Sequence, residues 1–224
     1  MFRKENMKIK DIYYKRNDYN VSMFISLLCV IVTIIAFFKP DLYYVIAYAY
    51  PIEYVWQLFS GIFLHGAPDL SIAYNMGHLI FNLLLVVTFG IMIENILGSK
   101  RFVLMFLVLW IANAASFYII ASNITPQGES AYGVGISGVT FAYGILGAYV
   151  LFTLGKRNLK LLLKQASFYF LLSVFIGMII MLHPGIAGTS SMIIHLVSVA
   201  IGIIYTICYR NVIYNFFETG NKNL

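Results

Sequence analysis

The stretch from residue 77 to residue 93, Gly77-His78-Leu79-Ile80-Phe81-Asn82 followed by LLLVVTFGIMI, contains no Asp, Glu, Lys or Arg. A helix of this length can cross the hydrocarbon core of a bilayer, which is about 30 Å thick. Further mainly apolar segments of similar length occur at 21–38, 102–122, 137–155, 166–182 and 192–209. The sequence therefore predicts an all-α polytopic membrane protein, a bundle of six transmembrane helices.

The composition supports a membrane protein and excludes an ordinary soluble domain. Of the 224 residues, 61% are hydrophobic and only 11% are charged, whereas soluble domains have about 25% charged residues. The net charge of +6 does not indicate nucleic-acid binding, because the Lys and Arg residues cluster between apolar spans. The expected surroundings are the lipid bilayer, with no nucleic acid as a partner. Cys29 and Cys208 lie in apolar stretches without CxxC spacing, which favours a packing role.

The basic residues predict the orientation in the membrane. Fourteen of the fifteen fall in the N-terminal segment, the connections after the second and fourth spans, and the C-terminal tail, which leaves only Lys39 on the other side. Since cytoplasmic connections carry the excess of Lys and Arg, both termini are expected in the cytoplasm. We therefore divide the chain into a basic N-terminal segment (1–20), a membrane domain (21–209) and a C-terminal tail (210–224), in a multi-pass protein of the plasma membrane.

The connection 39–76 is expected on the outer side. It is rich in Tyr and Trp and is interrupted by Pro40, Pro51 and Pro68. Tyr and Trp favour the membrane interface because their bodies are apolar and their tips polar. We expect this connection and the segment around His183-Pro184-Gly185 to flank the entrance to any site at that level.

Four polar residues inside the predicted spans are candidates for chemistry, since polar groups in a bilayer are costly. They are His78, Asn82, Ser137 and His195. The predicted topology places all four near the outer ends of their helices, at one depth. Bonds between helices are the structural alternative for each of them.

Ser137 follows a glycine-rich run, Tyr132-Gly133-Val134-Gly135-Ile136-Ser137-Gly138. The run can place the serine at a helix N-terminus, where free backbone N–H groups can hold an oxyanion. On that helix Phe141, Gly144 and Ala148 share the face of Ser137, and on the last span Ser198 and Gly202 share the face of His195. Small residues on both faces would let the two helices approach, so that His195 reaches the serine hydroxyl as its base.

His78 and Asn82 lie four residues apart and therefore share a face of the helix 77–93. Their N–H groups would suit a developing oxyanion.

The positions of the acidic residues exclude other classes of protease. An aspartyl protease needs two aspartates inside the spans, but all four lie outside them: Asp11, Asp18, Asp41 and Asp69. Glu94 lies at the inner end of the helix 77–93, far from Ser137. No HExxH motif for zinc is present. A Ser-His dyad without metal or cofactor is what these residues predict.

These motifs resemble the rhomboid family of intramembrane serine proteases. The resemblance rests on Gly77 to Asn82 continuing to Glu94 and Leu97-Gly98-Ser99, on Gly135-Ile136-Ser137-Gly138, and on His195 with Gly202. It implies six helices, a dyad of Ser137 and His195, an oxyanion site from Asn82 and His78, and an aromatic residue, here Phe141, packing on the histidine. The chain departs from the family pattern at Gln57, where arginine often follows the tryptophan, at Ser198, where glycine is common, and in the longer spacing from His65 to His78.

The implied activity is hydrolysis of peptide bonds in or near the transmembrane segments of single-span membrane proteins. The main alternative is a catalytically inactive relative that binds transmembrane clients without cutting them. A small transporter is disfavoured, because no charged residue lies in the middle of a span and no inverted repeat is visible.

Overall fold

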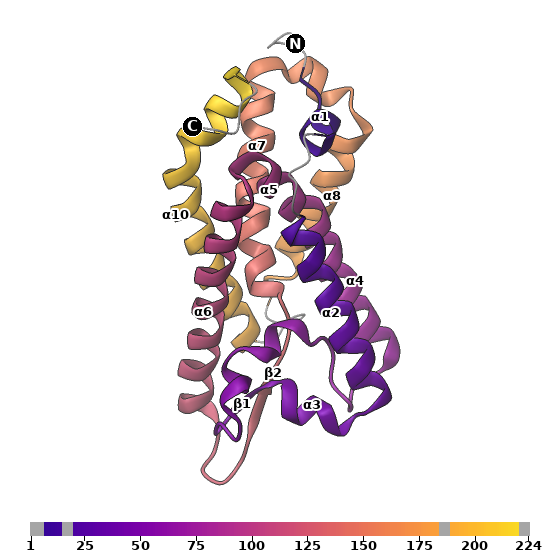
Figure 1. The fold of residues 1–224 in the computed structure, drawn as a ribbon, viewed down its shortest axis with the longest axis vertical. Coiled ribbons are helices and arrows are strands. Elements are labelled where there is room, and N and C mark those ends of the chain that lie inside the picture. The colour runs from indigo at the N-terminus through magenta and orange to yellow at the C-terminus, as the bar shows by residue number, and fades with distance from the viewer. Residues whose placement is uncertain (1–6, 15–19, 184–188, 220–224) are drawn as a thin grey trace.

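The computed structural model describes residues 7–14, 20–183 and 189–219. Its helices pack into an elongated bundle, with α1 and the end of α10 at the upper end and a short sheet at the lower end (Figure 1). The elements are α1 (Ile9–Tyr14), α2 (Val21–Phe38), α3 (Asp41–Ile46), β1 (Tyr48–Tyr50), η2 (Val55–Leu58), η3 (Ser60–Phe63), α4 (Ile72–Leu85), η4 (Val86–Gly90), α5 (Ile91–Leu97), α6 (Ser99–Ile124), β2 (Ala131–Gly133), α7 (Ser137–Leu163), α8 (Ala166–Ile180) and α10 (Thr189–Thr219).

Five helices of the described chain are long and apolar enough to cross a membrane, and they confirm the polytopic all-α fold. They are α2, the continuous run from α4 through the π-helical turn η4 to α5, α6, α7 and α10. The remaining predicted span, 166–182, corresponds to α8, whose 15 residues are fewer than such a helix needs. The total of six transmembrane helices therefore stays a prediction. Of the segment around His183 that was expected to flank the entrance, residues 184–188 lie outside the described residues.

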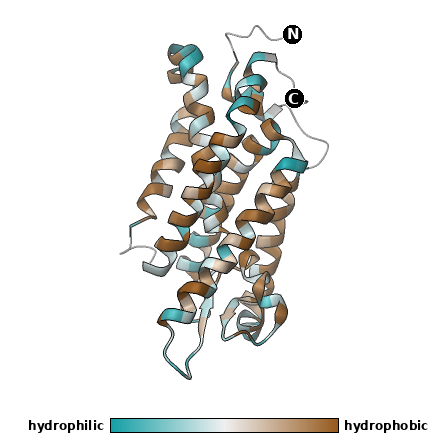
Figure 2. Cartoon of the chain, turned by 90° about the vertical axis from the view of Figure 1, so that its left-hand side faces the viewer, coloured by the Kyte–Doolittle hydropathy of each residue, from teal (hydrophilic) through white to brown (hydrophobic). Residues whose placement is uncertain are grey.

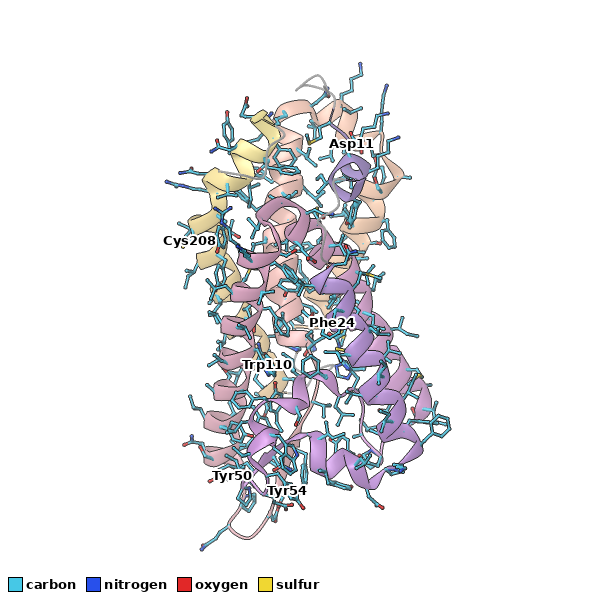
Figure 3. The ribbon with its side chains drawn as sticks, in the orientation of Figure 1. Asp11, Phe24, Tyr50, Tyr54, Trp110 and Cys208 are labelled. Carbon is cyan, nitrogen blue, oxygen red and sulfur yellow. The ribbon has the colours of Figure 1, made fainter. Side chains whose placement is uncertain are left out.

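Hydrophobic residues line the middle of the bundle and hydrophilic residues gather towards its ends (Figure 2). This is the pattern that a bilayer imposes on helices that cross it. The two ends differ: Asp11 marks the end with the termini, whereas Tyr50 and Tyr54 lie at the opposite end, with Phe24, Trp110 and Cys208 between (Figure 3).

Helix α7 is the centre of the bundle. In its most apolar stretch 72% of the residues are buried, against 17% for α10. The helix begins at Ser137, as predicted, and continues to Leu163, beyond the predicted end of the span. Helix α10 likewise continues to Thr219, into the segment expected to be a tail.

Glu94 joins the start of α2 to the turn between α5 and α6. Its carboxylate accepts hydrogen bonds from the backbone N–H groups of Val21 and Ser22, both at 2.9 Å, and from the hydroxyls of Ser22 at 2.6 Å and Ser99 at 2.8 Å. A carboxylate at a helix N-terminus satisfies free N–H groups and complements the helix dipole. Glu94 therefore holds helices together at the end of the bundle away from Ser137.

The connection between α2 and α4 supplies one strand of a small antiparallel sheet that the sequence analysis did not predict, and the connection between α6 and α7 supplies the other. Strand β1 pairs with β2 in the register Tyr48 to Gly133, Ala49 to Tyr132 and Tyr50 to Ala131. Each strand has only three residues, too few for an alternating pattern to stand out. The pairing ties the first connection to the residues that lead into Ser137.

Candidate active site

The structure brings together Ser137 on α7 and His195 on α10, two residues that are 58 positions apart in the sequence. His195 Nε2 lies 2.9 Å from Ser137 Oγ, within hydrogen-bond range. The histidine is 4% exposed, and among the described residues its buried Nδ1 has no hydrogen-bond partner. An imidazole protonated at Nδ1 can accept the serine proton at Nε2, which is the arrangement of a nucleophile and its base.

Phe141 fixes the plane of the His195 ring. The two rings are stacked, with centroids 4.1 Å apart and an interplanar angle of 13°. Phe141 lies one turn after Ser137 on α7, so one helix supplies both the serine and the surface that orients the His195 ring.

Close approach of α7 and α10 continues further along both helices. A Cβ on Gly202 would lie 2.9 Å from the Cα of Ala142, so only glycine fits without a shift. The prediction for Gly144 was wrong: a Cβ there would meet Met178 of α8, not α10. Because the two helices cross, α10 contacts Phe141 at one level of α7 and Ala142, on a neighbouring face, at the next. Gly144 lies on the face of α7 that packs against α8.

Asn82 lies beside the first turn of α7. It is 1% exposed; its Nδ2 donates to the backbone oxygen of His78 at 3.0 Å, and its Oδ1 accepts from Thr140 Oγ1 at 3.4 Å. Thr140 Oγ1 also lies 2.8 Å from the backbone oxygen of Ser137. An amide nitrogen carries two hydrogens, so one donor of Asn82 remains for a ligand.

His78 lies against the loop that precedes the serine. A Cβ on Gly135 would be 3.1 Å from His78 Cε1 and 3.3 Å from Nε2. Gly135 also has a φ of +109°, a conformation that favours glycine. The imidazole of His78 and the backbone before Ser137 are therefore in contact, as a shared oxyanion site requires.

Sequence reasoning missed His65, which supports this loop from behind. His65 is 3% exposed, its Nε2 accepts the N–H of Ile136 at 3.4 Å, and its ring meets that of His78 edge-on at 5.2 Å. Burial, together with the nearby His78, lowers the pKa of His65 to about 3, so this imidazole is neutral at physiological pH. No periodic pattern marks a buried histidine in a connection.

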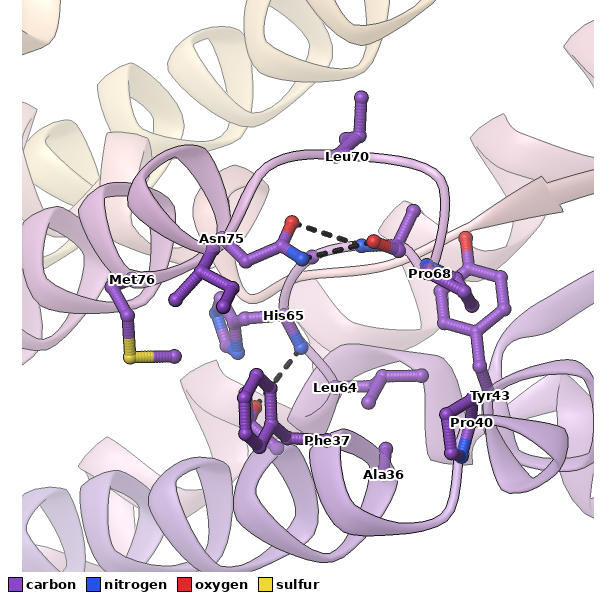
Figure 4. A pocket seen from close by; sticks show the side chains of 14 residues that line it. Ala36, Phe37, Pro40, Tyr43, Leu64, His65, Pro68, Leu70, Asn75 and Met76 are labelled. Atoms are coloured by element: carbon purple, nitrogen blue, oxygen red, sulfur yellow. Dashed lines mark hydrogen bonds between the residues drawn. The ribbon is translucent and has the colours of Figure 1, made fainter.

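A cavity of about 250 Å³ lies next to His65, between α2, the connection and α4 (Figure 4). At its rim the side-chain amide of Asn75 binds the backbone of Ala67 twice, at 3.1 and 2.9 Å, and the backbone N–H of His65 donates to Thr33 Oγ1 at 3.1 Å. These bonds hold the segment between His65 and α4 in place.

Asn113 on α6 was also missed, although a polar residue inside a span is the signal that marked the other four. It is 6% exposed, and its Nδ2 donates to the backbone oxygen of Leu109 at 2.7 Å and to Ser198 Oγ at 3.4 Å. Its side chain lies directly against Gly138, where a Cβ would be 2.8 Å from Nδ2. Asn113 therefore touches both the turn of Ser137 and the helix of His195.

Gln57 anchors the connection at the position where the family resemblance leads one to expect arginine. It is fully buried; its Oε1 accepts the N–H groups of Glu53 and Tyr54, both at 3.0 Å, and its Nε2 donates to the backbone oxygen of Tyr44 at 2.8 Å. A neutral amide makes these bonds without placing a charge in the interior.

A cavity of about 120 Å³ opens beside the Ser137 and His195 pair. Its lining residues come from the connection, β2, α6, α7 and α10: Tyr48, Asn113, Phe117, Tyr132, Gly133, Val134, Gly135, Ser137, Ser190, Ser191, Ile194 and His195. Within the described ranges, no three His, Cys, Asp or Glu side chains lie close enough to hold a metal ion.

The fold and site define a multi-pass helical membrane protein in which a serine and a histidine meet at one end of the bundle. The model of the rhomboid domain matches residues 53–212, which is well over half of the chain and includes His78, Asn82, Ser137 and His195. The chain belongs to the rhomboid family. A search of curated proteins finds no match.

Proposed function

We propose that this protein is an intramembrane serine endopeptidase that cuts single-span membrane proteins in or near their transmembrane segments. The observation that carries the proposal is the 2.9 Å contact between Ser137 Oγ and His195 Nε2 in a chain of the rhomboid family. Many residues could pack two helices together, but a hydroxyl on the ring nitrogen of a buried histidine is the arrangement that activates a nucleophile.

In the first step Ser137 Oγ attacks the substrate carbonyl carbon while His195 Nε2 takes the hydroxyl proton. The tetrahedral intermediate then collapses, and His195 returns the proton to the leaving amine, which departs with the C-terminal part of the substrate. Water, deprotonated by the same nitrogen, attacks the acyl-enzyme ester; the ester bond then breaks, the N-terminal part leaves as a carboxylic acid, and His195 returns the proton to Ser137 Oγ. Phe141 keeps the imidazole plane aligned through both steps, since the rings stack at 4.1 Å.

Charge on the carbonyl oxygen in the intermediate needs donors that are already in place. The N–H of Ser137, at the start of α7, has no partner within its own helix. We assign the oxyanion to this N–H together with Asn82 and His78, which lie beside the same turn. No metal or cofactor takes part in the proposed reaction.

The substrate must present an unwound peptide bond, since a helix with all its backbone hydrogen bonds hides its carbonyls. We place the dyad towards the outer side of the plasma membrane, with both termini in the cytoplasm. Support comes from the distribution of Lys and Arg over the connections. Substrates are then cut near their outer membrane boundary.

The test is a comparison of purified wild-type protein with Ser137→Ala, His195→Ala and the double variant, using a panel of single-span substrates and a fluorophosphonate probe. We expect each single variant to lose cleavage, and the double variant to be no worse, because members of a dyad act as a unit. Probe labelling must disappear in Ser137→Ala. Substantial cleavage by Ser137→Ala would rule out Ser137 as the nucleophile. If the wild-type protein binds the substrates without cutting them and does not react with the probe, it is a client-binding protein.

A further inference from the structure

An apolar hollow of about 530 Å³ lies between α7 and α8, in the half of the bundle away from Ser137. The two helices run side by side there and connect at the upper end of the bundle (Figure 1). The lining residues are Ala148, Leu151, Phe152, Gly155, Lys156, Leu159, Leu162, Phe168, Leu172 and Phe175, nine apolar residues and one lysine.

A break in α7 shapes this hollow. Asn158 has non-helical angles, φ −156° and ψ 81°, and its Oδ1 accepts the N–H of Leu161 at 2.9 Å, which starts a new turn. After the break Leu162 folds back towards Gly155, where a Cβ would be 3.3 Å from Leu162 Cδ2. The turn after Asn158 therefore forms the wall of the hollow at the basic end of the bundle.

Lys156 supplies a positive charge at the rim. Its side chain is exposed, and its Nζ lies 4.6 Å from the centre of the Phe152 ring. The neighbouring Arg157 is engaged differently, in an ion pair with Glu218 and a hydrogen bond to the backbone oxygen of Phe217. A second hollow of about 510 Å³ on the α10 side of α7 is also lined by Phe152 and Lys156, so this ammonium group stands where the two hollows meet.

We propose that the α7–α8 hollow binds one acyl chain of an anionic glycerophospholipid whose phosphate contacts Lys156. Phe152, Leu159 and Leu172 expose apolar surface on the open side of the hollow, which is the surface that a membrane-spanning bundle turns to lipid. The charge at the rim decides between headgroups, because a basic site between membrane helices attracts anionic lipids. Lipid binding in this hollow does not require proteolytic activity.

Binding is measured on the full chain, purified in a neutral detergent and stripped of lipid, by native mass spectrometry with added dioleoyl phosphatidylglycerol or dioleoyl phosphatidylcholine. We expect one phosphatidylglycerol to bind about fivefold more tightly than phosphatidylcholine, as one lysine near a membrane surface provides. Lys156→Ala should remove this preference. Lys160→Ala is the matched control, because Lys160 is an exposed lysine four residues further along the chain that does not line the hollow.

The acyl chain is tested separately with Leu172→Trp, which puts a larger side chain at an exposed position of the lining. This variant should bind both phosphatidylglycerol and phosphatidylcholine several-fold more weakly than the wild type. If Lys156→Ala and Lys160→Ala lose the preference for phosphatidylglycerol equally, the lipid is attracted by the basic surface in general, and the proposed site is overturned. Equal binding of the two lipids by the wild type, or a dimer mass that Leu172→Trp abolishes, would overturn it as well. If Leu172→Trp fails to fold, the two lysine variants still decide.

Discussion

Gly138 follows the candidate nucleophile directly, and replacing it with alanine should disturb the site through Asn113. The added Cβ would lie 2.8 Å from Asn113 Nδ2 and closer still to Asn113 Oδ1, whereas carbon and nitrogen atoms pack at about 3.5 Å or more. Asn113 is held by its bond to Leu109 at 2.7 Å, so the start of α7 has to move instead. Overpacking of this kind costs about 1–3 kcal/mol of folding free energy.

Activity should fall by more than the loss of stability suggests. A displacement of about 1 Å at the reacting atoms can cost roughly 100-fold in rate. We therefore expect Gly138→Ala to lower kcat/KM about 100-fold on a transmembrane substrate, with the variant still folded in a thermal unfolding assay. Truncating Asn113 to alanine in the same protein removes the colliding atoms, so the double variant should recover much of the lost activity.

Gly135 provides the matched control for this cycle. Its φ of +109° is unfavourable for any side chain, and its Cβ would meet His78, not Asn113. Gly135→Ala should therefore lose activity that Asn113→Ala does not restore. Cleavage by Gly138→Ala within twofold of the wild-type rate would refute a collision with Asn113. So would a Gly138→Ala, Asn113→Ala double variant as slow as Gly138→Ala alone, provided that Asn113→Ala by itself remains active.

Three further outcomes are expected. Asn82→Ala should slow cleavage by about tenfold to a thousandfold, as for one oxyanion donor, with the fold retained; an unfolded variant would make Asn82 structural. In a background without the exposed Cys208, a cysteine at Asp69 should react with an impermeant thiol reagent added to intact cells, whereas one at Lys160 should react only after permeabilisation; the reverse pattern would invert the topology. Unfolded chains bind a proton at His65 below about pH 6.5, whereas the folded protein does so only near pH 3. As the pH is lowered from about 6.5 to about 3, the free energy of unfolding should therefore decrease by up to about 5 kcal/mol. Urea titrations at several pH values should show a smaller decrease for His65→Gln than for the wild type. The same pH dependence in both proteins would contradict the burial argument.

Much of the membrane architecture was predictable because its signals are local. The span 21–38 coincides with α2, and the start of α7 at Ser137 follows from the glycines before it. Hydropathy and the 3.6-residue period depend only on neighbouring residues, so no knowledge of the remaining chain is needed. The same reasoning put His78 and Asn82 on one helix face, and the bond from Asn82 to the backbone of His78 agrees with it.

Contacts between distant segments had no such signal. The two three-residue strands were missed, and Gly144 was assigned to α10 although it packs on Met178 of α8. Helices rotate and cross as they pack, so which neighbour a face meets depends on angles that the sequence of one helix does not contain. Asn113 shows the same limit in part: its place inside a span was a local signal, but its contact with Gly138 on another helix was not.

By itself, the sequence determined that the chain is a helical membrane protein and which serine and histidine are candidates, because burial of apolar spans in lipid is a property of each segment alone. That the candidate residues share one depth in the bilayer stays a prediction. Only the tertiary structure decided that Ser137 Oγ and His195 Nε2 lie 2.9 Å apart, that His65 supports the loop before the serine, and that the break at Asn158 opens a hollow beside α8. Those features depend on the packing of side chains between helices, where a shift of one ångström separates a hydrogen bond from none.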